Sequence, residues 1–310
     1  MTATVTTPQK VTSSRPSRKV PRGYTRLRVE QVVVGVLRWL TIGLVLLACA
    51  GPLVYGVALS VRPLPDVYGD PLGILPSPSE VDFGSYVTAL TSTADGGFGL
   101  AGFMLNSLLV SLGTVAMSVA FSVLGAYAAV RLRFRGRNVI GAIFLMVYLF
   151  PGIVLAVPLF VMFTRAGLRG ELSGLMLIYL AQTVPVSIYM LRNYFLAVPE
   201  GIEEAAMIDG CSRMQVVTRI ILPLALPGIV STALYVFMIA WNEYLYALLF
   251  LVDQREKWTV SLGIAQLSDF AVPPTVLMAG SMAMTIPIVI LFVLAQRSLL
   301  SGLTAGAEKG

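Results

Sequence analysis

The side chains that most often carry chemistry in proteins are scarce in this sequence. It contains no histidine, the commonest metal ligand and the side chain best suited to proton transfer near neutral pH. Its two cysteines, Cys49 and Cys211, stand far apart in an apolar and a polar stretch, which provides neither a disulfide framework nor a thiolate zinc site. None of its lysines follows the glycine loop that cradles ATP phosphates. We therefore expect no catalytic residue, no metal site and no bound cofactor.

One polar segment, residues 198–225, has the residue pattern of two short helices joined by a turn. Pro199 suits the first position of a helix, and three acids in the opening turns suit its dipole. Gly210 can adopt the left-handed conformation that ends a helix, and Ser212 with Gln215 has the spacing of a capping box. The acids are Glu200, Glu203 and Glu204.

The first of these two helices is predicted to bind another surface. About eleven residues span roughly 16 Å of helix, and the small Ala205 and Ala206 allow close approach. An interfacial helix lying on lipid headgroups is the alternative. Three acids facing an anionic inner leaflet argue against it.

Composition places the rest of the chain in a membrane. Of 310 residues, 56% are hydrophobic and only 12% are charged, against about 25% charged in soluble domains. Six apolar stretches are long enough to span a bilayer. They predict an all-α, polytopic fold with spans at residues 39–59, 103–130, 139–163, 172–191, 226–251 and 276–295.

The net charge of +6 is explained by topology and not by nucleic acid. With alternating spans, 17 of the 22 Lys and Arg residues fall on the side of the N-terminus. Basic residues near span ends resist translocation, which predicts that both termini are cytoplasmic. We expect a disordered basic tail at 1–35, a first span and long extracytoplasmic loop at 36–102, a transmembrane domain at 103–297 containing cytoplasmic loop 198–225, and a cytoplasmic tail at 298–310.

Glu243 is the one carboxylate clearly within a predicted span, and such a group is a functional candidate. It lies about 25 Å along the helix from residue 226, near the outer interface, where Trp241, Tyr244 and Tyr246 predict an aromatic belt. Two interpretations stay open, pairing at a subunit seam and lining a solute path. The path candidates are Asn242, Glu243, Tyr244, Tyr148 and Gln182.

Three stretches resemble one known family. The run E-A-A at 204–206, Gly210, and Ile220-x-Leu222-Pro223 have the spacing of the EAA signature of binding-protein-dependent ABC importer permeases. W-N-E-Y at 241–244 and Q-R at 296–297, followed by G-L-T-A-G-A at 302–307, are similar to the sugar branch, particularly the maltose-type subunit with six spans. The resemblance covers residues 36–310.

The resemblance implies a type I importer permease in a prokaryotic inner (plasma) membrane, a non-catalytic subunit that moves a sugar by alternating access. It implies as partners a second, homologous permease, two ATPase subunits that bind ATP and Mg, and an extracytoplasmic sugar-binding protein. Residues implied to couple to the ATPase are Glu203, Glu204, Ala205, Ala206, Asp209, Gly210 and Pro223. A second implied ATPase contact comprises Gly306, Ala307, Lys309 and Gly310.

Two other functions remain as alternatives. An ion-coupled secondary carrier needs no ATPase, but such carriers tend to bury several ionisable groups near the midplane. An ABC permease for a non-sugar solute would share the loop at 198–225, and only the sugar-like stretches argue against it. A structural or scaffolding membrane protein would leave the EAA spacing unexplained.

Overall fold

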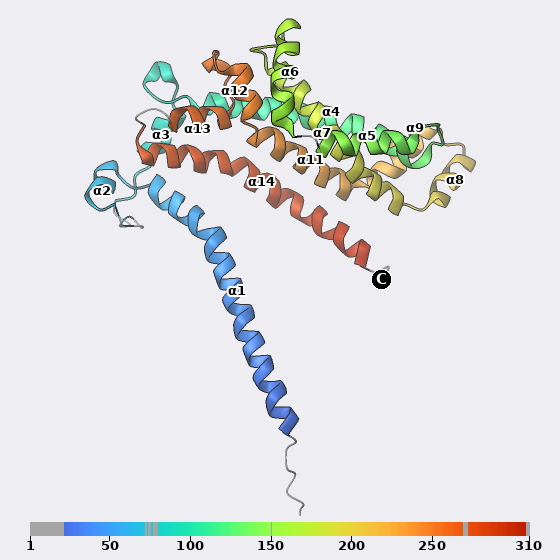
Figure 1. The fold of residues 1–310 in the computed structure, drawn as a ribbon, viewed down its shortest axis with the longest axis horizontal. Helices are drawn as coiled ribbons and strands as arrows, with labels where there is room; N and C mark the ends of the chain where they lie inside the picture. The colour runs from blue at the N-terminus through green and yellow to red at the C-terminus, as the bar shows by residue number, and fades with distance from the viewer. Residues whose placement is uncertain are drawn as a thin grey trace, which may run out of the picture. The chain divides into compact units, whose positions relative to one another are not determined.

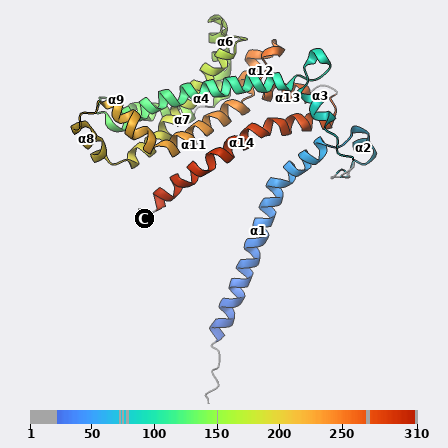
Figure 2. The ribbon, with the colours of Figure 1, turned by 180° about the vertical axis from the view of Figure 1, so that it is seen from behind.

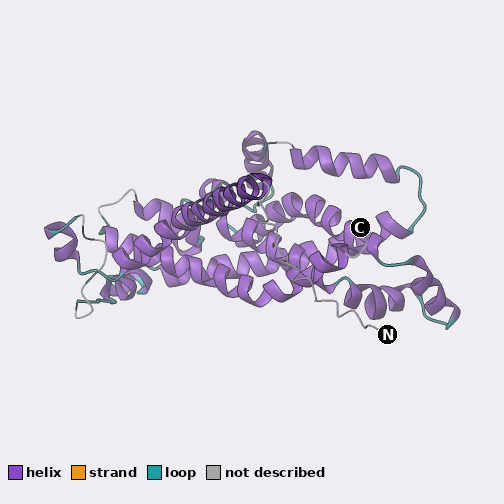
Figure 3. Cartoon of the chain, turned by 90° about the horizontal axis from the view of Figure 1, so that it is seen from below, coloured by secondary structure: helices purple, strands orange, loops and turns teal. Residues whose placement is uncertain are grey.

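The computed structural model describes residues 22–71, 73, 76, 80–149, 151–268 and 272–307, and in these residues the only regular secondary structure is helical (Figure 3). The chain divides into two compact units, residues 1–54 and 55–310, which are described separately. The predicted all-α class is confirmed for the described residues.

Helix α1 (Arg22–Ser60) begins earlier than the predicted first span. Residues 22–35, which were expected to belong to the disordered tail, lie within this helix. The part from Glu30 to Ser60 is long and apolar enough to cross a bilayer. Its apolar side chains up to Val57 are exposed, as suits a lipid-facing or subunit-facing helix, whereas Ala58 and Leu59 are buried. Residues 1–21 of the expected tail lie outside the described residues.

The second unit is built around four helices: α4 (Leu100–Arg131), α7 (Leu172–Ala197), α11 (Leu226–Asn242) and α14 (Pro274–Ala307). Helix α4 packs along α7 and α11, and α11 packs on α14, as the two opposite views in Figures 1 and 2 show. One apolar cluster fills the bundle around Leu175, Tyr179 and Trp241, and a second lies around Leu191 and Phe195.

A row of small hydroxyl side chains lets α4 and α7 approach closely. Thr183 of α7 donates to the Oγ of Ser118 at 3.1 Å, and the hydroxyls of Ser118 and Ser187 lie 3.3 Å apart. Without much hydrophobic gain between helices in lipid, small residues and interhelical hydrogen bonds favour association. The buried row on α4 comprises Ser107, Ser111, Thr114, Ser118 and Ser122.

The predicted third span is two helices, α5 (Arg137–Leu149) and α6 (Gly152–Arg165). The break falls at Pro151, inside the predicted span 139–163. Pro151 supplies the physical reason, because a proline disfavours helical conformation in the residue before it and offers no N–H of its own.

The predicted fifth span is also interrupted. Helix α11 ends at Asn242 and α12 (Leu245–Leu251) follows, so the predicted span 226–251 contains two helices. Before α11 come three short helices, α8 (Glu200–Ile208), α9 (Arg213–Val216) and α10 (Leu222–Leu224). The segment Arg213–Leu224 meets Leu226–Asn242 at an angle of 79°.

The long loop before α4 contains two helices that the sequence did not predict, α2 (Leu64–Gly69) and α3 (Gly84–Leu90), and a 3-10 turn at Thr93–Asp95. Arg62 is buried and donates to the carbonyl oxygens of Asp66 and Asp70, both at 3.0 Å. Helix α3 packs on α14, where Ser85 donates to Thr275 at 2.9 Å. Much of this loop is therefore ordered.

The remaining helix, α13 (Val260–Ser268), follows a 3-10 turn at Arg255–Lys257 and lies with α3 at one end of the bundle, while α8 and α9 lie at the opposite end (Figures 1 and 2). Four described helices can span a membrane by length and composition, or five if the bent pair ending in α11 is one span. Six spans and cytoplasmic termini stay predictions.

Alanine substitutions at two glycines can test how closely α11 packs against Tyr194 of α7. Both are the third residue of their helix, Gly228 in α11 and Gly102 in α4. A Cβ on Gly228 would lie 2.3 Å from the ring of Tyr194, whereas one on Gly102 would meet nothing within 4 Å. We predict that Gly228→Ala lowers stability by about 1–3 kcal/mol through overpacking, while Gly102→Ala is neutral or stabilising by up to about 1 kcal/mol. Thermal unfolding of the purified variants in detergent measures both, and equal shifts would contradict the packing.

Candidate functional site

Helix α8 has the two ends that the sequence predicts, with small differences in its bounds. Gly210 follows the helix with a φ of 91°, in the left-handed region. The N–H groups of Gly210 and Cys211 donate to the carbonyl oxygens of Met207 and Ala206 at 3.1 and 3.0 Å. This is the Schellman arrangement, which satisfies carbonyls at a helix end. Pro199 caps the helix and is not its first residue, and α8 has nine residues where about eleven were predicted.

The predicted capping box is confirmed at the start of α9. The N–H of Ser212 donates to Oε1 of Gln215 at 2.7 Å, and the N–H of Gln215 donates back to the Ser212 hydroxyl at 3.4 Å. A π-helical turn, Val217–Ile221, comes next and precedes Pro223 in α10. An ideal α-helix would place the proline ring against the carbonyl four residues earlier, and the widened turn lies where that conflict would arise.

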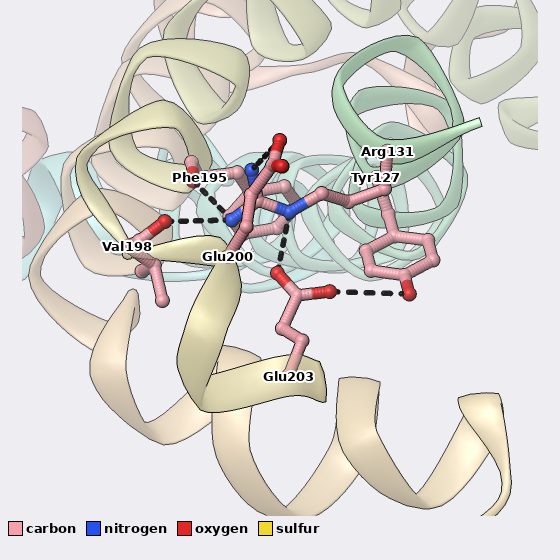
Figure 4. A network of polar contacts seen from close by, with 6 residues as sticks. All are labelled: Tyr127, Arg131, Phe195, Val198, Glu200 and Glu203. Atoms are coloured by element: carbon pink, nitrogen blue, oxygen red, sulfur yellow. Dashed lines mark hydrogen bonds and ion pairs between the residues drawn. The ribbon is translucent and has the colours of Figure 1, made fainter. Parts of the chain in front are cut away.

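One arginine joins α8 to the ends of α4 and α7 (Figure 4). Arg131, the last residue of α4, forms an ion pair through Nε with Glu203 and donates through Nη2 to the carbonyl oxygens of Phe195 and Val198 at 3.2 and 2.7 Å. Tyr127, one turn earlier on α4, donates to Oε2 of Glu203 at 3.4 Å. These side chains hold the first turn of α8 against the ends of α4 and α7.

Apolar packing supports the same face of α8. Ala206 lies three residues after Glu203, and both are buried. Ala206 belongs to one apolar cluster with Leu191 and Phe195 of α7 and with Val216 of α9. Helix α8 therefore packs on the last turns of α4 and α7 through one charged contact and one apolar contact.

The opposite face of α8 is uncovered. Ile208 is 85% exposed, and Ile202 and Met207 are also exposed. Glu204, Ala205, Asp209 and Gly210 complete this surface, which we name the α8 outer face together with those three apolar residues. It combines acids with apolar side chains that nothing in the described chain covers.

Of the second predicted ATPase contact, residues 306, 307, 309 and 310, the structure describes only the first two. Gly306 and Ala307 are the final two residues of α14, whose helix continues well past the predicted end of the last span at residue 295. Lys309 and Gly310 lie outside the described residues.

Glu243 is bound by its own chain at the break between α11 and α12. Its carboxylate accepts hydrogen bonds from the N–H groups of Tyr246 and Ala247 at 2.9 and 3.2 Å, and from the Tyr179 hydroxyl at 2.6 Å. The first N–H groups of a helix lack partners within the helix, and a carboxylate there satisfies them. Glu243, which lies between α11 and α12, thus caps the first turn of α12 and ties it to α7.

The other path candidates are only partly gathered around this break. Gln182 of α7 is half-buried and hydrogen bonds to Tyr246. Asn242 is exposed and donates to Met238 of its own helix at 2.8 Å, and Tyr244 is 39% exposed. The side chain of Tyr148 lies outside the described ones. Which of these residues line a path stays a prediction.

The predicted aromatic belt is wrong for two of its three members. Trp241 is 1% exposed and stacks on Phe237, and Tyr246 is 3% exposed. Both side chains point into the bundle, where α11 packs on α7, α13 and α14 and α12 packs on α6 and α7.

Comparison with known proteins identifies the family. The family described as "binding-protein-dependent transport system inner membrane component" matches residues 122–304. This chain belongs to that family. It is therefore an ABC transporter permease subunit, and such subunits are non-catalytic.

Several relatives of this permease carry names. It is 42% identical to the inner membrane ABC transporter permease protein YcjP of Escherichia coli (strain K12), over 69% of this chain and 76% of that one. It is 41% identical to the trehalose/maltose transport system permease protein MalG of Thermococcus litoralis, over 67% and 75%. It is 36% identical to the trehalose transport system permease protein SugB of Mycobacterium tuberculosis, over 67% and 76%.

Solved structures agree on the fold of the permease. A chain of a bacterial ABC transporter involved in import of the acidic polysaccharide alginate matches with a TM-score of 0.75 and 25% identity, covering 87% of this chain and 98% of that one. A second chain, from an alginate ABC transporter in complex with a pentasaccharide-bound periplasmic protein, has a TM-score of 0.62 and 15% identity, which shows the fold alone.

Sequence reasoning missed Arg131 and Tyr127 of the permease. Arg131 counted only among the 17 basic residues on the side of the N-terminus. It belongs to a run of four arginines at 131, 133, 135 and 137, and two signals were present. It is the first of the four, where the span's apolar pattern still continues, and Tyr127 lies one helical turn before it. A pairing partner on the next cytoplasmic segment was therefore a reasonable expectation.

Two substitutions separate capping by Glu243 from solute binding. We predict that Glu243→Ala destabilises the purified permease by about 1–2 kcal/mol, because the N–H groups of α12 lose their acceptor. Glu243→Gln keeps one acceptor oxygen and should cost less than half as much. Thermal unfolding in detergent measures both, with Asn242→Ala as a neighbouring control. Unchanged stability in Glu243→Ala would refute the capping role and favour a path role.

Proposed function

We propose that this permease is the translocation subunit of an ATP-driven importer that carries a sugar, a mono- or oligosaccharide, into the cytoplasm by alternating access. In this proposal the chain crosses the inner membrane six times, with α5 and α6 together forming the third crossing, and both termini are cytoplasmic. ATP and Mg bind to partner subunits.

The α8 outer face is the observation that carries the proposal. Ile202, Met207 and Ile208 are exposed together on this one short helix, and a group of exposed apolar side chains supports binding to another surface. Glu204 and Asp209 beside them are poorly suited to an anionic leaflet. A basic, apolar-lined recess on a cytoplasmic ATPase would satisfy both kinds of side chain.

The choice of a sugar rests on the relatives. Permeases named for trehalose or maltose transport are 41% and 36% identical to this chain, and one named for diacetylchitobiose uptake is 37% identical. The amide, hydroxyl and aromatic groups near the α11 break, including Gln182, Tyr244 and Asn242, are groups that can hydrogen bond and stack with a neutral sugar.

The proposed partners occupy different parts of the chain. Two ATPase subunits serve the importer, and one contacts the α8 outer face and the last residues, 306–310. A second, homologous permease completes the translocation path. An extracytoplasmic sugar-binding protein docks at the opposite end of the bundle, where α3 and α13 lie.

Co-purification and uptake together test this function. The tagged chain, extracted in mild detergent from its native cell, should retain a second permease and an ATPase. In proteoliposomes with that cell's extracytoplasmic binding proteins, labelled trehalose or maltose should enter only when ATP is present. Uptake that survives ATP depletion and disappears with ionophores would instead show an ion-coupled carrier, and absence of any ATPase would overturn the proposal.

The non-sugar alternative has its own readout. The ligand held by the co-purifying binding protein can be identified by mass spectrometry. A sugar supports the proposal, whereas an amino acid, metal or phosphonate overturns the sugar assignment and leaves the importer assignment intact.

Ile208 allows a direct test of the α8 outer face. We predict that Ile208→Ser lowers ATPase co-purification about tenfold or more, as expected when an interface loses a central apolar contact. Thermal stability of the isolated permease should be unchanged, because the side chain is 85% exposed. Tyr68→Ser, 69% exposed in α2 at the other end, is the control and should retain the ATPase. Equal retention in both variants would exclude this face as the contact.

A further inference from the structure

Arg131 uses every nitrogen of its guanidinium on residues that follow it by more than 60 positions. Nε binds Glu203, Nη1 lies 3.5 Å from Glu200, and Nη2 donates to the carbonyl oxygens of Phe195 and Val198. The contacts therefore join three helices at one point: the end of α4, the end of α7 and the first turn of α8.

We propose that Arg131 is a positioning residue that makes α8 move as one body with the inner ends of α4 and α7. This inference rests on the proposed function, because it states how force applied to α8 by an ATPase reaches the spans. Arg131 does not itself contact the ATPase in this proposal. It prevents α8 from rotating on its flanking turns when it is pushed.

The chain connections alone are poorly suited to transmit such a force. On one side, α8 joins α7 through Val198 and Pro199 only. On the other side, a left-handed glycine, a π-helical turn and a 79° bend separate α8 from α11. The short turns permit rotation, whereas a contact from α4 across to α8 resists it.

Burial makes the Arg131 contact stiff. The side chains of Arg131 and Glu203 are 9% and 6% exposed, so water screens their attraction little. The guanidinium is a planar fork whose donors have fixed directions, which lets it bind a carboxylate and two carbonyls at once. A lysine carries the same charge but cannot reproduce this set of directions.

The carbonyls add a second reason for a cation at this place. Phe195 lies in the last turn of α7 and Val198 directly follows the helix, so their oxygens lie at the negative end of the α7 dipole. Arg131 neutralises that end while it binds the acid of α8. The same group thus stabilises the end of one helix and the start of the next.

Variants must remove the contact without leaving a buried charge unpaired, since breaking one half of a buried pair is strongly destabilising. The double variant Arg131→Met with Glu203→Met removes both charges and keeps similar volume. Ala206 and the apolar cluster beneath it remain to hold the fold. Arg131→Lys keeps the charge alone, and Arg133→Met changes an exposed arginine two residues away as the matched control.

Hydrogen exchange of the purified chain in detergent is the first arm of the test. In the double variant, exchange of the α8 amides should rise about tenfold or more, because local opening becomes easier. Arg131→Lys should give an intermediate rise, and Arg133→Met should match the unchanged chain. Exchange in Arg131→Lys equal to the unchanged chain would overturn the role of the guanidinium fork.

The second arm uses the co-purified complex with and without ATP, Mg and orthovanadate, which traps the ATPase. In the unchanged complex, exchange should respond to trapping in α8 and also in residues 123–131 of α4 and 191–198 of α7. In the double variant, α8 should still respond while the α4 and α7 ends lose at least half of their response. A purely local structural role would leave these distant responses unchanged.

The two arms separate failure of this inference from failure of the proposed function. If the double variant matches the unchanged chain in both arms, Arg131 is not the link and the inference is overturned. If the unchanged chain retains no ATPase, the importer assignment fails, and the first arm still decides whether Arg131 holds α8.

Discussion

The close approach of α4 to α7 is the contact on which the second unit depends. In lipid the helices gain little by burying leucine against leucine, so packing distance and interhelical hydrogen bonds decide which helices associate. Buried hydroxyls such as Ser118 and Thr183 provide both, because they are small and they bind one another across the seam. With α4 and α7 fixed, the positions of α11, of Arg131 and of the loop between α7 and α11 follow.

Charged side chains satisfy backbone groups at three helix ends in the described part of this chain. Backbone groups freed at a helix end cannot bond to water inside a bilayer and must find partners in the protein. Glu243 accepts from the first N–H groups of α12, and Arg62 and Arg131 donate to the last carbonyls of α2 and α7. The charged groups nearest the spans therefore lie where the backbone needs them. At the break between α11 and α12, this explains how a span can be interrupted without becoming unstable.

The sequence predicted what depends on local pattern and failed where partners come from distant residues. Apolar length located each long helix, and cap chemistry located the turn at Gly210 and the start of α9 at Ser212. Apolar length predicted one span across Pro151 and one across Glu243 without locating either break, because it does not show where a backbone bond is replaced. Trp241 was assigned to an interface for a similar reason: depth in a span does not tell which side faces protein.

The site shows the same limit within a single motif. The run Glu203 to Ala206 is continuous in sequence, but successive residues of an α-helix point about 100° apart. Glu203 and Ala206, three positions apart, are buried on the bundle, while Glu204 and Ala205 are exposed. A motif that sequence treats as one contact is thus divided between two surfaces. The buried half fixes α8 to α4 and α7 and the exposed half is uncovered, which is the arrangement that the proposed coupling requires.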